Sequence, residues 1–162
     1  MMIGVVADTH SHAVPRQLLE ELKKVDLIVH AGDFCSLKEY NLFAKIKPLE
    51  AVFGNMDEPP LRRQLPESKI FEWQNFKIGL YHGEGAPDRV LEKIQAKFQG
   101  KKCDAVIFGH SHQPFNQRMG ETLYFNPGSP NDTIFAPFFS YGLIEVKEGK
   151  LVGTIVKLKG DG

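Results

Sequence analysis

The sequence has few cysteines, no net charge and no long apolar run, and each of these shortages excludes a class of protein. Two cysteines, Cys35 and Cys103, are too few for a disulfide framework or a cysteine-rich zinc site, so we expect two reduced thiols. The 20 Lys and Arg residues balance 20 Asp and Glu residues, which leaves no strong signature for nucleic acid or an anionic membrane. No apolar run approaches the roughly 20 residues of a transmembrane helix. The first residues are apolar but lack the basic flank and the length of a signal peptide. These shortages together predict a cytoplasmic protein.

The length of 162 residues and a hydrophobic content of 42% are ordinary for one globular unit. We expect a single domain over residues 1–162. The sequence shows no internal repeat, low-complexity segment or linker.

The first third of the chain alternates strand patterns with helix patterns. Apolar runs at 3–7, 26–30 and 49–53 predict strands. Pro15 suits the first turn of an intervening helix, and the run Ser36-Leu37-Lys38-Glu39 matches a capping box at the start of another. Strands alternating with helices indicate a parallel sheet with right-handed crossovers.

The rest of the chain is richer in antiparallel patterns. Prolines at 59, 60 and 66 predict irregular chain, and a further helix is expected from Pro87 to a cap at Gly100. A buried strand is expected at 104–108. Antiparallel strand pairs are expected at 69–73 with 76–81, 115–119 with 121–126, and 139–147 with 150–157. A parallel half followed by an antiparallel-rich half predicts two sheets packed face to face, with helices outside.

Side chains that can bind a metal follow most of these strands. They are Asp8, His10, Asp33, Asn55, Asp57, His82, His110 and His112. Ligand sites in α/β sheets lie outside the carboxyl ends of strands, so we expect these loops to converge on one edge. On extended backbone, His110 and His112 would project to the same side. Carboxylates, imidazoles and an amide suit divalent Mn, Fe, Zn, Co or Ni, and a shared carboxylate could bridge two ions, as in two-metal hydrolases.

Five motifs in this order resemble the calcineurin-like metallophosphoesterase superfamily, and within it the small YfcE-type phosphodiesterases of bacteria and archaea. They are Asp-x-His at 8–10, Gly-Asp at 32–33, Gly-Asn at 54–55, His-Gly at 82–83 and Gly-His-x-His at 109–112. The resemblance implies an α/β fold, a four-layer α/β/β/α sandwich of two mixed sheets flanked by helices. It also implies two metal ions, Mn foremost and otherwise Zn, Fe, Ni or Co.

The resemblance also assigns the ligands. Asp8, His10 and His112 would hold the first metal, and Asn55, His82 and His110 the second. Asp33 would bridge the two. A hydroxide bridging both metals would attack phosphorus in line with the leaving oxygen, with Asp33, Asn55 and His82 as catalytic residues and the Asn55 amide on the phosphoryl group. The expected substrate is a small phosphodiester. A phosphomonoester or nucleotide substrate, and a scaffold resembling the retromer subunit of this fold, stay as alternatives.

One position departs from the broader superfamily. There the Gly-Asn motif is usually followed by His, which contacts phosphate and helps the leaving group, whereas this chain has Met56. The YfcE-type branch also lacks that His. The departure predicts weak protonation of the leaving group, so that activated aryl or cyclic esters would be cleaved better than alkyl esters.

Several residues keep two interpretations. His12 would either lie near the leaving group or be solvated, and Asp57 would either orient a ligand histidine or cap a loop. His30 is expected in the core or behind the ligands. The aromatic stretch 135–139 is expected in the core, with an oligomer contact or a pocket wall as the alternatives.

Overall fold

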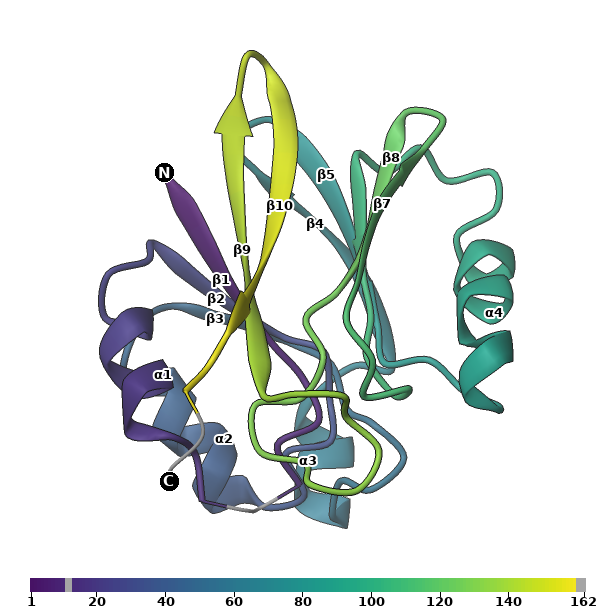
Figure 1. Ribbon diagram of the computed structural model, residues 1–162. Helices are drawn as coiled ribbons and strands as arrows, with labels where there is room; N and C mark the ends of the chain where they lie inside the picture. The colour runs from purple at the N-terminus through teal and green to yellow at the C-terminus, as the bar shows by residue number, and fades with distance from the viewer. Residues whose placement is uncertain (11–12, 160–162) are drawn as a thin grey trace.

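The computed structural model describes residues 1–10 and 13–159, which form two five-stranded sheets (Figure 1). The first sheet has the order β10-β9-β1-β2-β3. Its three consecutive strands β1, β2 and β3 are parallel, and the hairpin of β9 and β10 joins them antiparallel to β1. The strands are β1 (Met2–Val6), β2 (Leu27–His30), β3 (Leu49–Ala51), β9 (Ser140–Lys147) and β10 (Lys150–Lys157).

The second sheet has the order β4-β5-β6-β8-β7. Parallel pairing joins β5, β6 and β8 in the middle, and antiparallel pairing adds β4 and β7 at the edges. The strands are β4 (Ser68–Trp73), β5 (Phe76–Tyr81), β6 (Ala105–Ile107), β7 (Phe115–Met119) and β8 (Thr122–Asn126). Both sheets are therefore mixed, as expected.

Helices cover the outer faces of the two sheets and complete four layers (Figure 1). Buried side chains of the first three helices pack with the outer face of the first sheet, and those of α4 with the second. The helical segments are α1 (Arg16–Leu22), α2 (Leu37–Ala44), α3 (Pro59–Gln64), η1 (Pro87–Arg89) and α4 (Val90–Lys97). The predicted α/β/β/α sandwich is confirmed. No helix in the described part of the chain is long and apolar enough to span a membrane.

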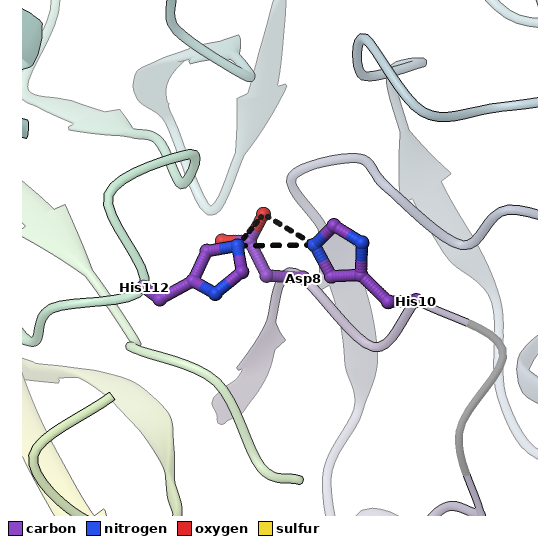
Figure 2. Close-up of side chains that lie close together, drawn as sticks. All are labelled: Asp8, His10 and His112. Carbon is purple, nitrogen blue, oxygen red and sulfur yellow. Dashed lines mark hydrogen bonds and ion pairs between the residues drawn. The ribbon is translucent and has the colours of Figure 1, made fainter. Parts of the chain in front are cut away.

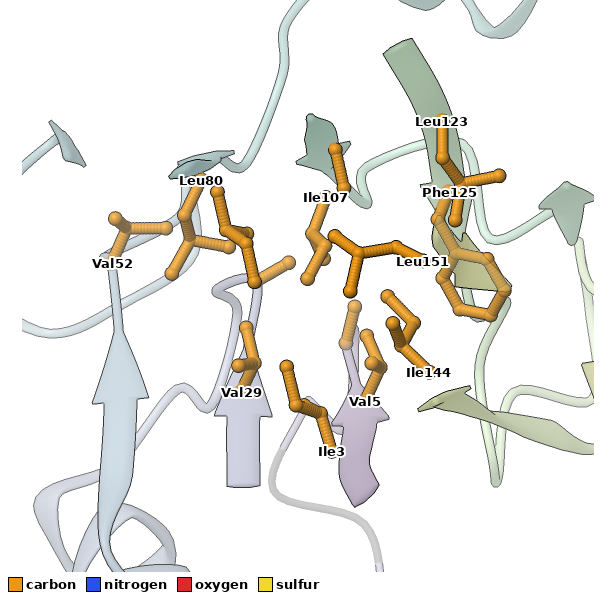
Figure 3. Packing of buried hydrophobic residues seen from close by; sticks show 14 residues of the cluster. Ile3, Val5, Val29, Val52, Leu80, Ile107, Leu123, Phe125, Ile144 and Leu151 are labelled. Atoms are coloured by element: carbon orange, nitrogen blue, oxygen red, sulfur yellow. The ribbon is translucent and has the colours of Figure 1, made fainter. Parts of the chain in front are cut away.

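The central core lies between the two sheets (Figure 3). Alternation along the strands produces it: Ile3 and Val5 of β1 face the second sheet, while Val6 packs with the helices on the other side. Leu80 and Ile107 approach from the opposite sheet, and all of these side chains are fully buried. The sandwich thereby fixes the edge at which the strands of both sheets end.

Two local expectations have different outcomes. The helix start expected at Ser36 is confirmed, because the Glu39 amide donates to the Ser36 hydroxyl at 3.3 Å, which is one of the two bonds of a capping box. The irregular chain expected around Pro59 and Pro60 is wrong, because the segment forms α3. Both prolines occupy the first turn of α3, where the missing N–H costs nothing.

The last hairpin does not follow the division of the sequence into two halves. Although β9 and β10 lie in the antiparallel-rich half, they extend the parallel first sheet, with Met2 opposite Glu145. The pairing leaves the inner face of β9 to the central core through Ile144.

Phe125 of β8 crosses from the second sheet to the hairpin, where glycines make room for its ring. A Cβ on Gly142 would lie deep inside the van der Waals radius of the ring, and one on Gly153 would lie 2.6 Å from it. Phe125 is fully buried, so it has no free space into which to move. The glycines thus allow the ring to fill the space between the sheets.

We expect Gly142→Ala to lower the free energy of unfolding by about 1–3 kcal/mol through overpacking. Urea denaturation of the metal-free protein measures it. The cost should shrink in a Phe125→Leu background, because the smaller side chain relieves the clash. Equal costs in both backgrounds would contradict the stated cause.

Candidate metal centre

Loops from both sheets meet at one edge, where the strands end. The Asp8 amide donates to the Gly32 carbonyl at 3.0 Å, and the Gly109 amide donates to the His82 carbonyl at 3.0 Å. These bonds join the loops after β1 and β2 in one sheet and after β5 and β6 in the other. The His110 amide donates to Asp8 Oδ2 at 3.0 Å and so joins the two sheets, which places these candidate ligands at one edge, as the strand-end pattern predicts.

Three side chains form a first group at this edge (Figure 2). The Nε2 atoms of His10 and His112 lie 3.0 Å apart, and Asp8 Oδ1 lies 3.6 Å and 3.5 Å from them. Figure 2 shows both imidazoles turned toward the carboxylate from opposite sides. Three donor atoms so close together can share one cation.

A second set of donors lies beside the first. Asn55 Oδ1 is 3.1 Å from Nε2 of His82 and 3.3 Å from Nδ1 of His110. The two histidines of the 109–112 loop therefore belong to different sets, one with Asp8 and His10 and the other with Asn55 and His82.

Asp33 lies between the two sets. Its Oδ2 is 3.4 Å from His10 Nε2 and 3.1 Å from His82 Nε2. Asp8 Oδ1 is also only 3.7 Å from His82 Nε2, so Asp8, Asp33 and His82 form a second candidate metal group. The resemblance implies that Asp8 holds one metal alone, whereas the geometry brings it near both sets.

The backbone at these residues is left-handed. Asp8, Asp33, His110 and His112 have φ values of 58°, 63°, 70° and 62°, and His10 and Cys35 share this conformation. Extended backbone at His110 and His112 was expected and is wrong, because a tight turn with a bond from the Ser111 amide to the Gly109 carbonyl separates them. Such backbone costs about 1–3 kcal/mol per non-glycine residue and clusters at functional sites.

Hydrogen bonds behind the imidazoles fix which ring nitrogen faces the centre. His82 Nδ1 donates to the Ala31 carbonyl at 2.7 Å, and His110 Nε2 donates to the Gly85 carbonyl at 2.8 Å. His112 Nδ1 donates to the Asp132 carboxylate at 2.6 Å. Each bond engages the rear nitrogen and turns the other toward the centre, where it can bind a metal in place of a proton, as metal-binding histidines require.

The roles of Asp132 and of the two carbonyl groups could not be predicted from the sequence. Asp132 lies 20 residues after His112 in a loop, and no spacing rule connects the two. Every residue has a carbonyl oxygen, so the roles of Ala31 and Gly85 carry no signal in the sequence.

Two buried carboxylates dominate the electrostatics of the site. In the described part of the chain, the ion-pair partners of Asp8 and Asp33 are all histidines. Burial opposes the protonated form of His82, but Asp8 and Asp33 outweigh it and raise the pKa of His82 to about 9. The same carboxylates raise the pKa of His10 against the effect of burial.

The donor set fits divalent metal ions. Among residues 1–10 and 13–159, Asp8 Oδ1 is buried and has no hydrogen-bond partner, although such an atom is costly to leave unpaired. Imidazole nitrogens, carboxylates and an amide oxygen surround it. A cation would satisfy these atoms together and neutralise the buried negative charge.

A model of the "Calcineurin-like phosphoesterase superfamily domain" matches residues 1–149. The chain belongs to this superfamily. It is 35% identical over 134 residues to a "Probable metallophosphoesterase" of Methanothermobacter thermautotrophicus, covering 80% of this chain and 77% of that protein. It is 30% identical over 146 residues to a phosphodiesterase of Methanocaldococcus jannaschii, covering 79% and 83%.

The fold is also similar to a crystal structure of Vps29 from Entamoeba histolytica complexed with Zn²⁺. The TM-score is 0.73 at 24% identity, over 97% of this chain and 99% of that one. This calcineurin-like chain thus has the same fold as the protein named Vps29.

A buried carboxylate holds the loops of the calcineurin-like site together. Asp57 accepts hydrogen bonds from the amides of Asp33, Cys35 and Gly54 at 3.0, 2.6 and 2.7 Å. Burial raises the pKa of Asp57. Asp57 therefore caps the loop that presents Asp33 and contacts no ligand histidine through these bonds.

The turn at 126–129 ties the remaining loops to the centre. Asn126 donates to the Gly109 carbonyl and to the Ser111 hydroxyl, each at 3.1 Å. Ser129 donates to the Asp8 carbonyl at 2.8 Å. This turn therefore fixes the loops of Asp8 and His110 together.

The other singled-out residues have separate places. His12 lies outside the described residues. His30 is fully buried and stacks on Phe34 at 3.5 Å, and burial lowers its pKa well below the usual value, so it is a neutral core residue. Met56 donates its amide to Asp33 Oδ1 at 2.8 Å and leaves its side chain half-exposed. Of the aromatic stretch, Phe135 is 68% exposed, so a core role is wrong for it.

We expect Asp132→Asn to weaken Mn²⁺ binding by about 10- to 100-fold, because the amide is a poorer acceptor for His112 Nδ1–H. Isothermal titration calorimetry on the metal-free protein measures the affinity. Asp88→Asn, on the exposed η1, is the control and should bind as the parent does. Parent-like affinity in Asp132→Asn would contradict the positioning role.

Proposed function

We propose that the chain is a dinuclear metal-dependent phosphodiesterase that hydrolyses a small phosphodiester. The convergence of two donor sets on Asp8 and Asp33 carries this proposal, since two-metal hydrolases need adjacent sites with a shared ligand. The family match supports the reaction class, and the relative named a phosphodiesterase supports the diester. The match over 1–149 also supports one domain across the chain.

The roles of the ligands follow the two sets. Asp8, His10 and His112 would hold one ion, Asn55, His82 and His110 the other, and Asp33 would bridge them. Mn²⁺ is the proposed ion, with Zn, Fe, Ni and Co as alternatives, because all accept imidazole and carboxylate ligands. The rear hydrogen bonds at Ala31, Gly85 and Asp132 hold the imidazoles in the required tautomers.

When bound, two divalent cations supply Lewis-acid activation of water and neutralise charge on the phosphoryl oxygens. The protein's part is to position the donor side chains and the phosphoryl group. Asp33 is held by the Asp57-capped loop and by the Met56 amide, so its carboxylate cannot turn away. The Asn55 side-chain N–H can donate to a phosphoryl oxygen while its Oδ1 stays with the two histidines.

A scaffold role is the competing hypothesis. The likeness to Vps29 at 24% identity shows the fold alone. A scaffold needs no oriented imidazoles, whereas three imidazoles here are held by rear hydrogen bonds with one ring nitrogen toward the centre. The complete donor set therefore favours an enzyme.

We expect hydrolysis of bis(p-nitrophenyl) phosphate that requires Mn²⁺ and disappears with EDTA. Asp33→Asn should lower kcat/KM by about 100-fold, which corresponds to roughly 2.7 kcal/mol of lost transition-state stabilisation. Initial rates of p-nitrophenol release measure it, with Asp88→Asn as control. The enzyme hypothesis fails if no metal-dependent turnover exceeds that of Asp33→Asn. Faster turnover of p-nitrophenyl phosphate would instead indicate a phosphomonoesterase.

The side chain of Met56 cannot donate a proton, so the leaving group should depart largely unprotonated. We expect kcat to fall steeply as the pKa of the leaving alcohol rises across a series of aryl and alkyl phosphodiesters. A flat dependence under conditions in which chemistry limits the rate would show that another group protonates the leaving oxygen.

A further inference from the structure

Two large apolar side chains stand exposed in the loop that follows Asp132. Ile134 is 78% exposed and Phe135 is 68% exposed, and they are neighbours in the loop between β8 and β9. Scattered single apolar residues on a surface need no explanation, but Phe135 also contacts a residue of the first donor set, His112, and exposed apolar side chains at such a place are a feature of binding sites.

The loop that carries the pair is held in place. Asp132 Oδ1 accepts from the Ile134 amide at 2.9 Å, and Asp132 Oδ2 accepts from the amides of Phe135 and Ala136 at 3.1 Å each. The same Oδ2 accepts from His112 Nδ1. One buried carboxylate thus fixes both a candidate metal ligand and the backbone that presents the apolar pair.

Phe135 is also in direct contact with the centre. Its ring lies 6.0 Å from the His112 ring, with the two planes at 80°. The Phe135 ring lies beside His112, so an ester substituent on that side of a phosphoryl group held between the two donor sets would meet an aromatic ring. A flat hydrophobic substituent gains both apolar burial and ring contact there.

We infer that Ile134 and Phe135 form an apolar platform that binds a flat aromatic ester substituent of the substrate, and so select phosphodiesters that carry an aromatic ring. The inference rests on the proposed phosphodiesterase function and names the substituent that the site prefers. Phe135 acts by contact with the substrate. Three backbone amides of the loop already donate to Asp132, so little ordering is required when the ring docks.

The decisive comparison uses two diesters with the same leaving group. Bis(p-nitrophenyl) phosphate retains an aryl substituent at phosphorus, and methyl p-nitrophenyl phosphate retains a methyl group. For Phe135→Ala, kcat/KM should fall about five- to tenfold for the first and less than about twofold for the second, as expected for a lost ring contact. Intrinsic differences in reactivity cancel, because each ester is compared between parent and variant.

Matched variants separate contact from general damage. Phe135→Tyr keeps the ring and should retain the preference for the aryl ester. Ile70→Ala removes a 41% exposed apolar side chain from β4 and should change neither ester. Equal losses for both esters in Phe135→Ala would mean that the ring acts through His112, and would overturn the platform.

A binding measurement tests the platform without turnover. The Mn²⁺-loaded parent should bind phenylphosphonate more tightly than methylphosphonate by calorimetry, and Phe135→Ala should lose that difference. If the parent hydrolyses neither ester yet shows this preference, the proposed reaction fails while the platform stands. No preference in the parent overturns the platform even if both esters are hydrolysed.

Sedimentation velocity tests whether Ile134 and Phe135 are instead covered by a second copy of the chain. A parent dimer that Phe135→Ala converts to monomer, with the ester preference unchanged, would make the pair a contact between copies and overturn the platform. A sedimentation coefficient unaffected by the substitution, with a lost ester preference, supports it.

Discussion

The close approach of two buried carboxylates, Asp8 and Asp33, is the constraint on which the rest of the centre depends. Their negative charge draws protons to histidines in the absence of another cation, as the raised pKa of His82 shows. Left-handed backbone, rear hydrogen bonds and the Asp57 cap all hold the donor side chains in positions where a divalent ion would neutralise this charge. The strained turns lower the stability of the protein, but they hold the donor groups in the positions that an ion would require.

Much of the edge could be predicted because parallel strands end together. Asp33, His82 and His110 follow short buried strands, and chain direction alone places their loops on one side. The five motifs added the order of ligands. The start of α2 could be predicted, because Ser36 is a typical capping residue. The start of α3 could not, because two adjacent prolines usually indicate irregular chain, whereas here they begin a helix.

The groups behind the ligands could not be predicted, because their roles exist only in three dimensions. Asp132 reaches His112 across a loop whose path is set by the bonds of Ser129 to the amides around it and to the Asp8 carbonyl. The exposure of Phe135 was equally hidden: an aromatic run is usually buried, and here the amide bonds to Asp132 hold it at the surface instead. The candidate metal ligands thus lie at the strand ends, whereas Phe135, the residue proposed to select the substrate, lies in the loop beside them.

The pairing of β1 with β9 sets a condition on how the protein is made. The strand β1, which Asp8 follows, lies in the middle of the first sheet, yet one of its two neighbours, β9, comes more than 130 residues later. A chain emerging from the ribosome therefore holds β1 with an open hydrogen-bonding edge until residues 140–147 arrive, and an open edge invites pairing with other chains. Asp132 and Ser129 are also made late, so the loops of the candidate centre are complete only after most of the described residues have been made. The edge of β1 therefore stays open until the hairpin of β9 and β10 closes the sheet.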